Sequence, residues 1–239
     1  MASGTIIQNP AVATFSGASS VNKTYGSACT NGSLLVAMAT QEVDAGTFTI
    51  SDPTNGTWAN DKTQASGAGG NPSTGTVRSI QNTATTALTV TCTVGTSGYG
   101  TLSIFEETGM ATSTPVDVTG GAGGAATTAT MSMTTGTANC TVYSCGAGYG
   151  SASPPDTNYT THFGPTGLSN AYHQGEYRQD AGAAGGITLT HGWTGTPNTW
   201  MICAVAYKPA GGAATTRGTP FGHRGTAFNG GRTFHGIIQ

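Results

Sequence analysis

The stretch Ala87-Leu-Thr-Val-Thr-Cys-Thr-Val94 decides the fold class of this 239-residue chain. Leu88, Val90, Cys92 and Val94 alternate with threonines, so in an extended strand the apolar side chains point to one face and the hydroxyls to the other. A strand with one buried and one hydrated face is typical of an antiparallel sheet. The stretch therefore predicts a β protein with hydroxyl-bearing outer faces.

Other parts of the chain extend this pattern. No segment combines helical i, i+3, i+4, i+7 spacing of apolar residues with helix caps. We therefore expect an all-β fold, an antiparallel, jelly-roll-like β-sandwich with almost no helix and two sheets closing on one core. The further strands that we expect are Thr5–Ile7, Leu34–Thr40, Thr47–Ile50, Val77–Gln81, Thr101–Glu106, Thr127–Met133, Ala138–Cys145, Gly175–Arg178, Ile187–His191 and Trp200–Tyr207.

The composition points the same way. Charged residues make up only 8% of the chain, against about 25% in an ordinary soluble protein, and 38 residues are glycine. Few charges are left to keep a free surface soluble by repulsion. Such a composition is typical of virion shells, fibres and secreted domains, and it argues against a cytosolic enzyme.

The predicted strands occur in a similar order in two halves of a body that spans residues 1–211. The pseudo-repeats cover about 28–110 and 134–211. Each has a first strand, a loop with an aromatic residue, a strand before a small-residue turn, and a terminal apolar strand. Either an internal duplication or convergent β patterning accounts for this order. The glycine-rich segment Gly109–Thr128 between the halves is predicted to be a flexible linker.

Several short packing and turn motifs follow one another along the body. They are Gly32-Ser-Leu-Leu-Val-Ala37, Pro53 with Trp58, Phe105-Glu-Glu-Thr-Gly-Met110, Thr114-Pro-Val-Asp117 and Ala204-Val-Ala-Tyr-Lys-Pro-Ala210. Over about residues 5–211 this order resembles a β-sandwich domain that is common in structural proteins of tailed bacteriophages and in related bacterial surface proteins. The resemblance implies a structural role in the virion, as a capsid decoration or cement protein or as a fibre component, and it implies no catalytic or ligand residues.

Residues 212–239, which we name the arm, differ in charge from the body. The body has five Lys and Arg against ten Asp and Glu, whereas the arm has three Arg and no acid. Such asymmetry marks an interaction segment. We expect the arm to bind copies of this protein and other virion proteins, such as major capsid or tail proteins. Three arginines are too few for firm nucleic-acid binding. The predicted contact residues are Arg217, Phe221, His223, Arg224, Phe228, Arg232, Phe234, His235 and Ile237.

We expect no catalytic, cofactor-binding or metal-binding residues. The five histidines lack metal-binding spacing, and loop or surface positions are favoured over a spatial site such as Asp156, His162 and His173. Glu106 and Glu107 are adjacent on a predicted strand, so they point to opposite sides, and a solvated strand end is the favoured interpretation. The alternative function is a glycan- or receptor-binding module of a phage fibre. Its candidate aromatic residues are Trp58, Tyr159, Phe163, Tyr172 and Trp193.

The cysteines and the start of the chain bear on where the protein is made. We find no signal-peptide pattern after Met1, and the longest apolar run, Trp200–Tyr207, is too short to cross a bilayer. We therefore expect synthesis in the host cytoplasm, incorporation into the virion and no membrane partner. In that compartment cysteines stay reduced. All five, Cys29, Cys92, Cys140, Cys145 and Cys203, are expected to be free and mostly buried.

Overall fold

The computed structural model describes residues 2–42, 46–67, 73–125, 128–149, 151–152, 158–169, 171–194 and 199–211. Within these ranges every regular element is a strand, which confirms the predicted all-β class. All strand pairs are antiparallel.

The strands divide at residue 110 into two groups. The first comprises β1 (Thr5–Gln8), β2 (Ala13–Thr24), β3 (Leu34–Gln41), β4 (Phe48–Asp52), β5 (Gly56–Thr57), β6 (Ala59–Ala65), β7 (Thr74–Gln81) and β8 (Thr89–Thr108). The second comprises β9 (Val116–Gly124), β10 (Thr128–Thr134), β11 (Thr141–Tyr149), β12 (Ser151–Ala152), β13 (Thr160–Leu168), β14 (Ala171–Arg178), β15 (Gly186–Thr194) and β16 (Trp200–Tyr207).

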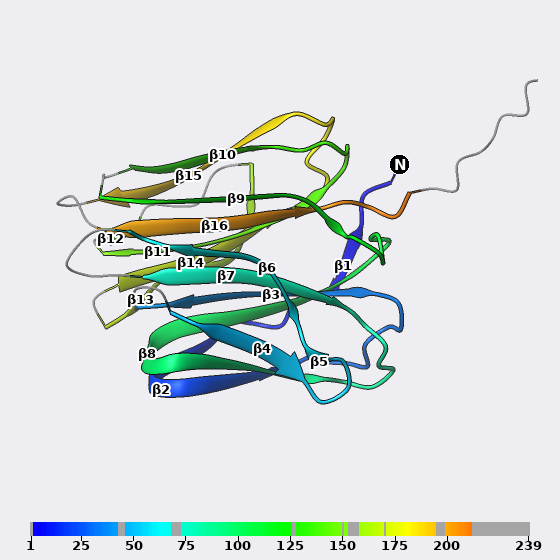
Figure 1. Ribbon diagram of the computed structural model, residues 1–239, viewed down its shortest axis with the longest axis horizontal. Coiled ribbons are helices and arrows are strands. Elements are labelled where there is room, and N and C mark those ends of the chain that lie inside the picture. Colours follow the sequence, from blue (N-terminus) through cyan, green and yellow to red (C-terminus); the bar gives the residue numbers. More distant parts are fainter. Residues whose placement is uncertain are drawn as a thin grey trace, which may run out of the picture.

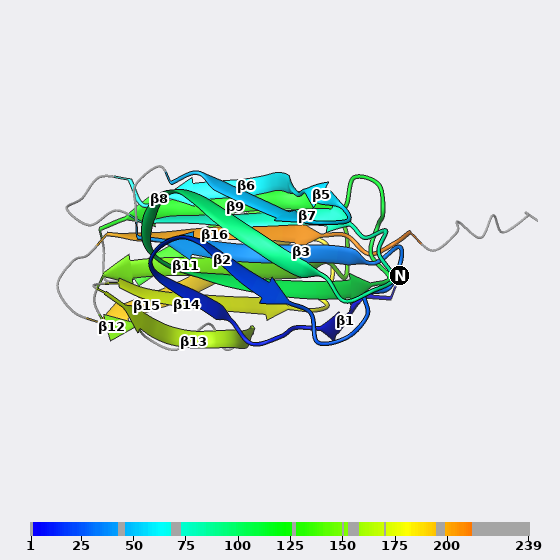
Figure 2. The same cartoon turned by 90° about the horizontal axis from the view of Figure 1, so that it is seen from below.

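The strands stack in four layers (Figure 1). At the top β10 pairs with β15, and below them lies the sheet β13-β14-β11-β16-β9. The third layer contains β6, β7, β3 and the C-terminal part of β8. The bottom layer contains β2, β4 and the N-terminal part of β8, which run obliquely across the third layer in Figure 2. The molecule is therefore two β-sandwiches packed face to face.

One long strand, β8, belongs to both lower layers. Its first residues pair with β2 and β4, and Gly100–Glu107 pair with β3. The backbone passes close to its neighbours at Gly100, where a Cβ would collide with the Phe15 ring and the Thr40 carbonyl oxygen. Glycine is thus required where the strand passes from one layer to the other.

Three hydrophobic cores fill the spaces between the layers. The first lies between the bottom and third layers around Leu35, Ile50 and Val90, and the third lies beneath β10 and β15 around Leu189 and Ile202. The second joins the two sandwiches through side chains of β3, β8, β11 and β16. The expected single core is therefore wrong, because β3, β8, β11 and β16 bury both of their faces.

The two halves share a pairing order. The first half reads β6-β7-β3-β8-β1, and the second reads β13-β14-β11-β16-β9. In each half a further strand pair covers one face: β2 and β4 flank β8, and β10 and β12 flank β15. The common order agrees with the repeat seen in the sequence, while the duplication itself stays a prediction.

The glycine-rich middle of the predicted flexible linker is a strand, because β9 pairs with β16 along Val116–Gly124. A Cβ at Gly123 would lie 2.5 Å from the Ser66 carbonyl oxygen and 2.7 Å from that of Ala65. The glycines of this segment therefore permit close packing of β9 against the first half. Among the longer strands, β2, β6 and β13 were also not expected, since their sequences are too polar to show the alternation. The two-residue strands β5 and β12 were not expected either.

Candidate functional site

The predicted contact residues of the arm all lie outside the described residues, which end at Gly211. The place where the arm begins is defined. Met110 and Pro209 form an antiparallel bridge, and the Ala210 amide donates to the Gly109 carbonyl at 2.8 Å. The arm therefore leaves the body where the chain passes from the first half to the second.

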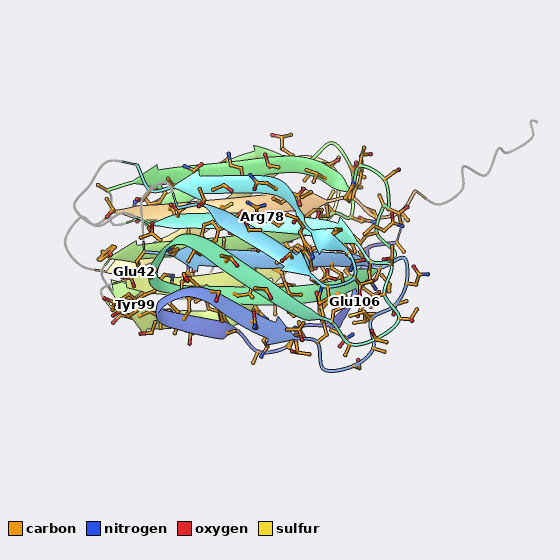
Figure 3. All side chains as sticks on the ribbon, turned by 60° about the horizontal axis from the view of Figure 1, so that its bottom comes forward. Glu42, Arg78, Tyr99 and Glu106 are labelled. Carbon is orange, nitrogen blue, oxygen red and sulfur yellow. The ribbon has the colours of Figure 1, made fainter. Side chains whose placement is uncertain are left out.

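Several carboxylates of the body point inward, and those of Asp52, Glu106, Glu107 and Glu176 are buried. Figure 3 shows Glu42 beside Tyr99 at one end and Glu106 at the other, with the half-buried Arg78 between them. Glu106 and Glu107 are both fully buried, so the predicted solvated strand end is wrong. They do point to opposite sides of β8. Glu106 accepts a 2.9 Å bond from the Ser33 hydroxyl of its own half, whereas Glu107 faces the second half.

Glu107 joins the two sandwiches. Its carboxylate accepts hydrogen bonds from the hydroxyls of Thr141, at 2.5 Å, and Tyr143, at 2.9 Å. Burial raises the pKa of Glu107 to about 7, although the two hydroxyls oppose this shift. The carboxyl group is therefore poised to change protonation near neutral pH inside the contact between the halves.

Several more polar contacts cross between the halves, including three from the second half to Glu42. The Tyr207 hydroxyl of β16 donates to the Asp61 carboxylate of β6 at 2.6 Å. The His173 Nδ1 atom of β14 lies 2.8 Å from the Thr40 hydroxyl of β3. Together with Glu107, these contacts fix the relative position of the two sandwiches along their shared core.

The described histidines occupy interior rather than surface or loop positions. His173 and His191 are fully buried, and the His191 Nε2 atom lies 2.8 Å from the buried Glu176 carboxylate. His162 is partly buried and packs on Phe105 with ring centroids 4.6 Å apart. The prediction of surface histidines is wrong for these three. Among the described residues no three His, Cys, Asp or Glu side chains are grouped as a metal site requires, and Asp156, His223 and His235 lie outside them.

A second buried polar group surrounds Glu176. Ser144 on β11 lies opposite Glu176 on β14, and Gln174 lies two residues before it. The Ser144 hydroxyl, both polar atoms of the Gln174 amide and the Glu176 Oε2 atom lack a protein partner. Orphaned buried polar atoms are typical of places that hold internal water. Because Ser144, Gln174 and Glu176 are fully buried, we assign this polar group a structural role.

The aromatic residues considered for glycan binding are mostly core residues. Trp58, Tyr159 and Phe163 are buried, and the Trp58 Nε1 atom donates to Asp52 at 2.8 Å. Tyr172 is partly buried and packs against the third core. The Trp193 side chain is not among those that the structure describes. These four aromatic rings therefore pack into the cores and do not form the exposed platform that the glycan-binding alternative needs.

All five cysteines are free and buried, which confirms their predicted burial. Burial raises the pKa of the Cys29 thiol to about 11 and those of Cys92 and Cys140 to about 12. Cys145 and Cys203 lie directly opposite each other on β11 and β16, within the second core. The sulfur atoms therefore act as small apolar groups in the cores.

The two outward faces of the stack carry hydroxyls instead of charges. The alternation that predicted the strand Ala87–Val94 places threonines on the bottom face, and β10 and β15 repeat the pattern on the top face. Cross-strand hydroxyl pairs occur on both, at 2.9 Å for Thr24–Thr89 and 3.2 Å for Ser132–Thr188. The bottom face presents Ser20, Asn22, Thr24, Thr49, Ser51, Thr89, Thr91 and Thr93, and the top face presents Thr128, Thr130, Ser132, Thr134, Thr188 and Thr190.

Comparison with known proteins adds no identification. No protein-family model, no curated protein and no solved structure matches this chain. Among the described residues no helix has the length and apolar character needed to cross a bilayer. The fold defines an all-β, β-sandwich protein.

Proposed function

We propose that this protein is a structural, non-enzymatic subunit of a bacteriophage virion, a capsid decoration or cement protein or a fibre component that acts by assembly. In this account the double sandwich is a rigid block, its neutral faces contact copies of itself, and the arm binds a neighbouring subunit or another virion protein. The sequence resemblance supports the assignment to a phage particle. The low charge on the surface of the body supports a role in assembly.

The observation that carries the proposal is the distribution of charge. Five carboxylates form hydrogen bonds or ion pairs within the body, so they contribute little electrostatic repulsion between copies. They belong to Glu42, Asp52, Glu106, Glu107 and Glu176. The two outward faces then meet solvent with neutral hydroxyls and amides. A surface with little charge favours association between copies, and the same face on two copies allows a closed symmetric contact.

Charge insertion on the two faces tests this proposal. Thr93 and Thr130 are exposed on the bottom and top faces, so Thr93→Lys and Thr130→Lys should leave the fold intact. We expect the purified wild-type chain to self-associate and the double variant to do so at least about tenfold more weakly, since like charges across a contact cost several kcal/mol. Analytical ultracentrifugation measures both.

The matched control places the same charge elsewhere. Thr161 is exposed on β13, the edge strand of the second layer, and belongs to neither face, so Thr161→Lys should associate like the wild type. A wild-type chain that stays monomeric at all concentrations, or a double variant that associates normally, would contradict the role of the faces.

A further inference from the structure

A cleft of about 340 Å³ opens beside the junction of the two halves. Asp61, Ser79 and Ile80 line it from the first half, and Thr112 and Pro115 line it from the segment that leads into the second. Its polar groups are one carboxylate, hydroxyls and an amide, set against apolar walls. No lining residue is basic or aromatic.

The backbone directs Asp61 toward the second half. Asn60 pairs with Arg78 and Lys62 pairs with Val77, so Asp61 is the extra residue of a β-bulge. Bulges re-aim a side chain and are common near binding sites. Here the Asp61 carboxylate faces Tyr207, while the Lys62 side chain lies near Gly121 on β9.

The cleft wall also contains a strained residue. Thr114, between the lining residues Thr112 and Pro115, has a φ of 47°. A β-branched residue in this region is an outlier, and such strain often accompanies ligand sites. The surrounding hydrogen bonds hold the segment in place, including the one from the Lys208 amide to the Pro115 carbonyl at 2.9 Å.

The residues that line the cleft favour binding of a cation over binding of an anion or a sugar. Burial raises the pKa of Asp61, although hydrogen bonds from Ser79 and Tyr207 and the charge of Arg78 oppose this shift. The Arg78 Nη2 atom is bonded to the Phe48 carbonyl at 2.6 Å. A further positive charge in the cleft would favour the ionised carboxylate. An anion would find no basic partner among the lining residues, and a sugar would find no aromatic ring to stack on.

We infer that this cleft binds the guanidinium group of an arginine from the arm of a second copy of this protein. The inference rests on the proposed function, and it names the site that receives the arm. The hydroxyls and the carboxylate would accept guanidinium hydrogen bonds, and Ile80 and Pro115 would pack on the aliphatic stem. The opposite charges of arm and body are complementary.

The arm begins beside the cleft, so two copies that meet at this end can exchange arms. Pro115 lines the cleft, and its carbonyl accepts a hydrogen bond from the amide of Lys208, three residues before the described chain ends. Two copies related by a two-fold axis at this end would each bring the start of the arm beside the other's cleft. At about 3.3–3.6 Å per residue, a chain of the length from Lys208 to Arg217 can reach at most roughly 30 Å. Reciprocal exchange of this kind is a low-cost route to a dimer.

Zero-length cross-linking of the full-length chain tests the inference. In a variant with Arg217→Lys, Arg224→Lys and Arg232→Lys, a carbodiimide can couple an arm amine to a carboxylate that it touches. An equal mixture of ¹⁴N- and ¹⁵N-labelled chains distinguishes links between copies from links within one chain. Mass spectrometry should find links between an arm lysine and Asp61 that join differently labelled chains. Their yield should exceed that of links to the exposed control Asp180 by at least about tenfold.

Adding Asp61→Asn to the same variant should abolish these links and leave those to Asp180 unchanged. Links confined to one chain, links spread evenly over Asp61 and Asp180, or no link to Asp61 would each overturn the inference. If links to Asp61 are absent but removal of the arm still prevents assembly, the arm binds elsewhere and the proposed function stands.

Discussion

The hydroxyl of Tyr143 on β11 donates a 2.9 Å hydrogen bond to the carboxylate of Glu107 on β8. This bond passes between the two sandwiches, inside a core that also contains Phe105 and Tyr207. Each half has its own core, so the contact around Glu107 decides whether the body behaves as one rigid block. The stability of that contact should depend on pH.

Replacing Glu107 should remove one pH-dependent contribution to stability. Its pKa is about 7 in the folded protein, above the unfolded value of about 4.3. The folded state therefore favours the protonated acid, and this stability is complete below pH 4.3 and lost as pH rises through 7. Glu107→Gln cannot ionise. Its free energy of unfolding relative to wild type should increase by roughly 3 kcal/mol from pH 4.5 to 8, as measured by urea denaturation.

The exposed Asp180 provides the control for this experiment. Asp180→Asn removes a carboxylate from an exposed turn, so it is the matched control for the loss of one negative charge. A difference between Glu107→Gln and wild type that stays constant across this pH range would show that Glu107 does not titrate in the contact.

His162 should contribute the opposite pH dependence. Burial, together with the charge of Lys23, lowers its pKa to about 4. Protonation in the unfolded chain, near pH 6.5, therefore destabilises the fold as pH falls from 6.5 toward 4. His162→Phe retains an aromatic ring beside Phe105 and cannot titrate. We expect its stability relative to wild type to rise as pH falls through this range, and an unchanged difference would refute the assignment.

The cysteines should be almost unreactive in the folded protein. All five are buried, and the raised pKa values of Cys29, Cys92 and Cys140 leave little thiolate at pH 8. Titration with a thiol reagent should find few reactive groups in the native protein and five after denaturation. Recovery of fewer than two thiols after denaturation without reductant would mean that disulfides have formed.

The glycines of β9 should resist substitution. A Cβ at Gly123 would lie 2.5 Å from a backbone carbonyl oxygen, which cannot move as a side chain can. Gly123→Ala should lower the free energy of unfolding by about 1–3 kcal/mol, as overpacking does. Gly164→Ala, on the edge strand β13 with no atom within 4 Å of its Cβ, is the matched control and should be nearly neutral. Equal stability of the two variants would contradict the close packing of β9.

The sequence could predict those strands that show either a clear alternation of apolar and polar residues or a continuous apolar run. The alternation at Leu88–Val94 and the apolar run Trp200–Tyr207 both became core strands. The glycines of β9 resembled a linker because their role depends on Ser66, a residue distant in the chain. Local patterns carry no information about such a neighbour.

Contacts with residues that are distant in the sequence also explain why the burial of Glu106 and Glu107 was not predicted. Glu106 and Glu107 end a predicted strand, where solvent is the usual environment for an acid. Their burial depends on hydroxyls from Ser33 and Thr141, which lie far away in the sequence. For the same reason Asp61 was not considered as a site residue, since its bulge and its partner Tyr207 appear only once β6 meets β16.

The most direct test of assembly through the arm is incorporation of a shortened chain into particles. Phage should be produced in cells in which residues 212–239 are deleted from this protein, and purified particles should be analysed by quantitative mass spectrometry. We predict that the shortened chain keeps a melting temperature near that of the full chain, since all described strands lie within residues 1–211, and that it is lost from particles. A shortened chain present in particles at the wild-type level would contradict the account.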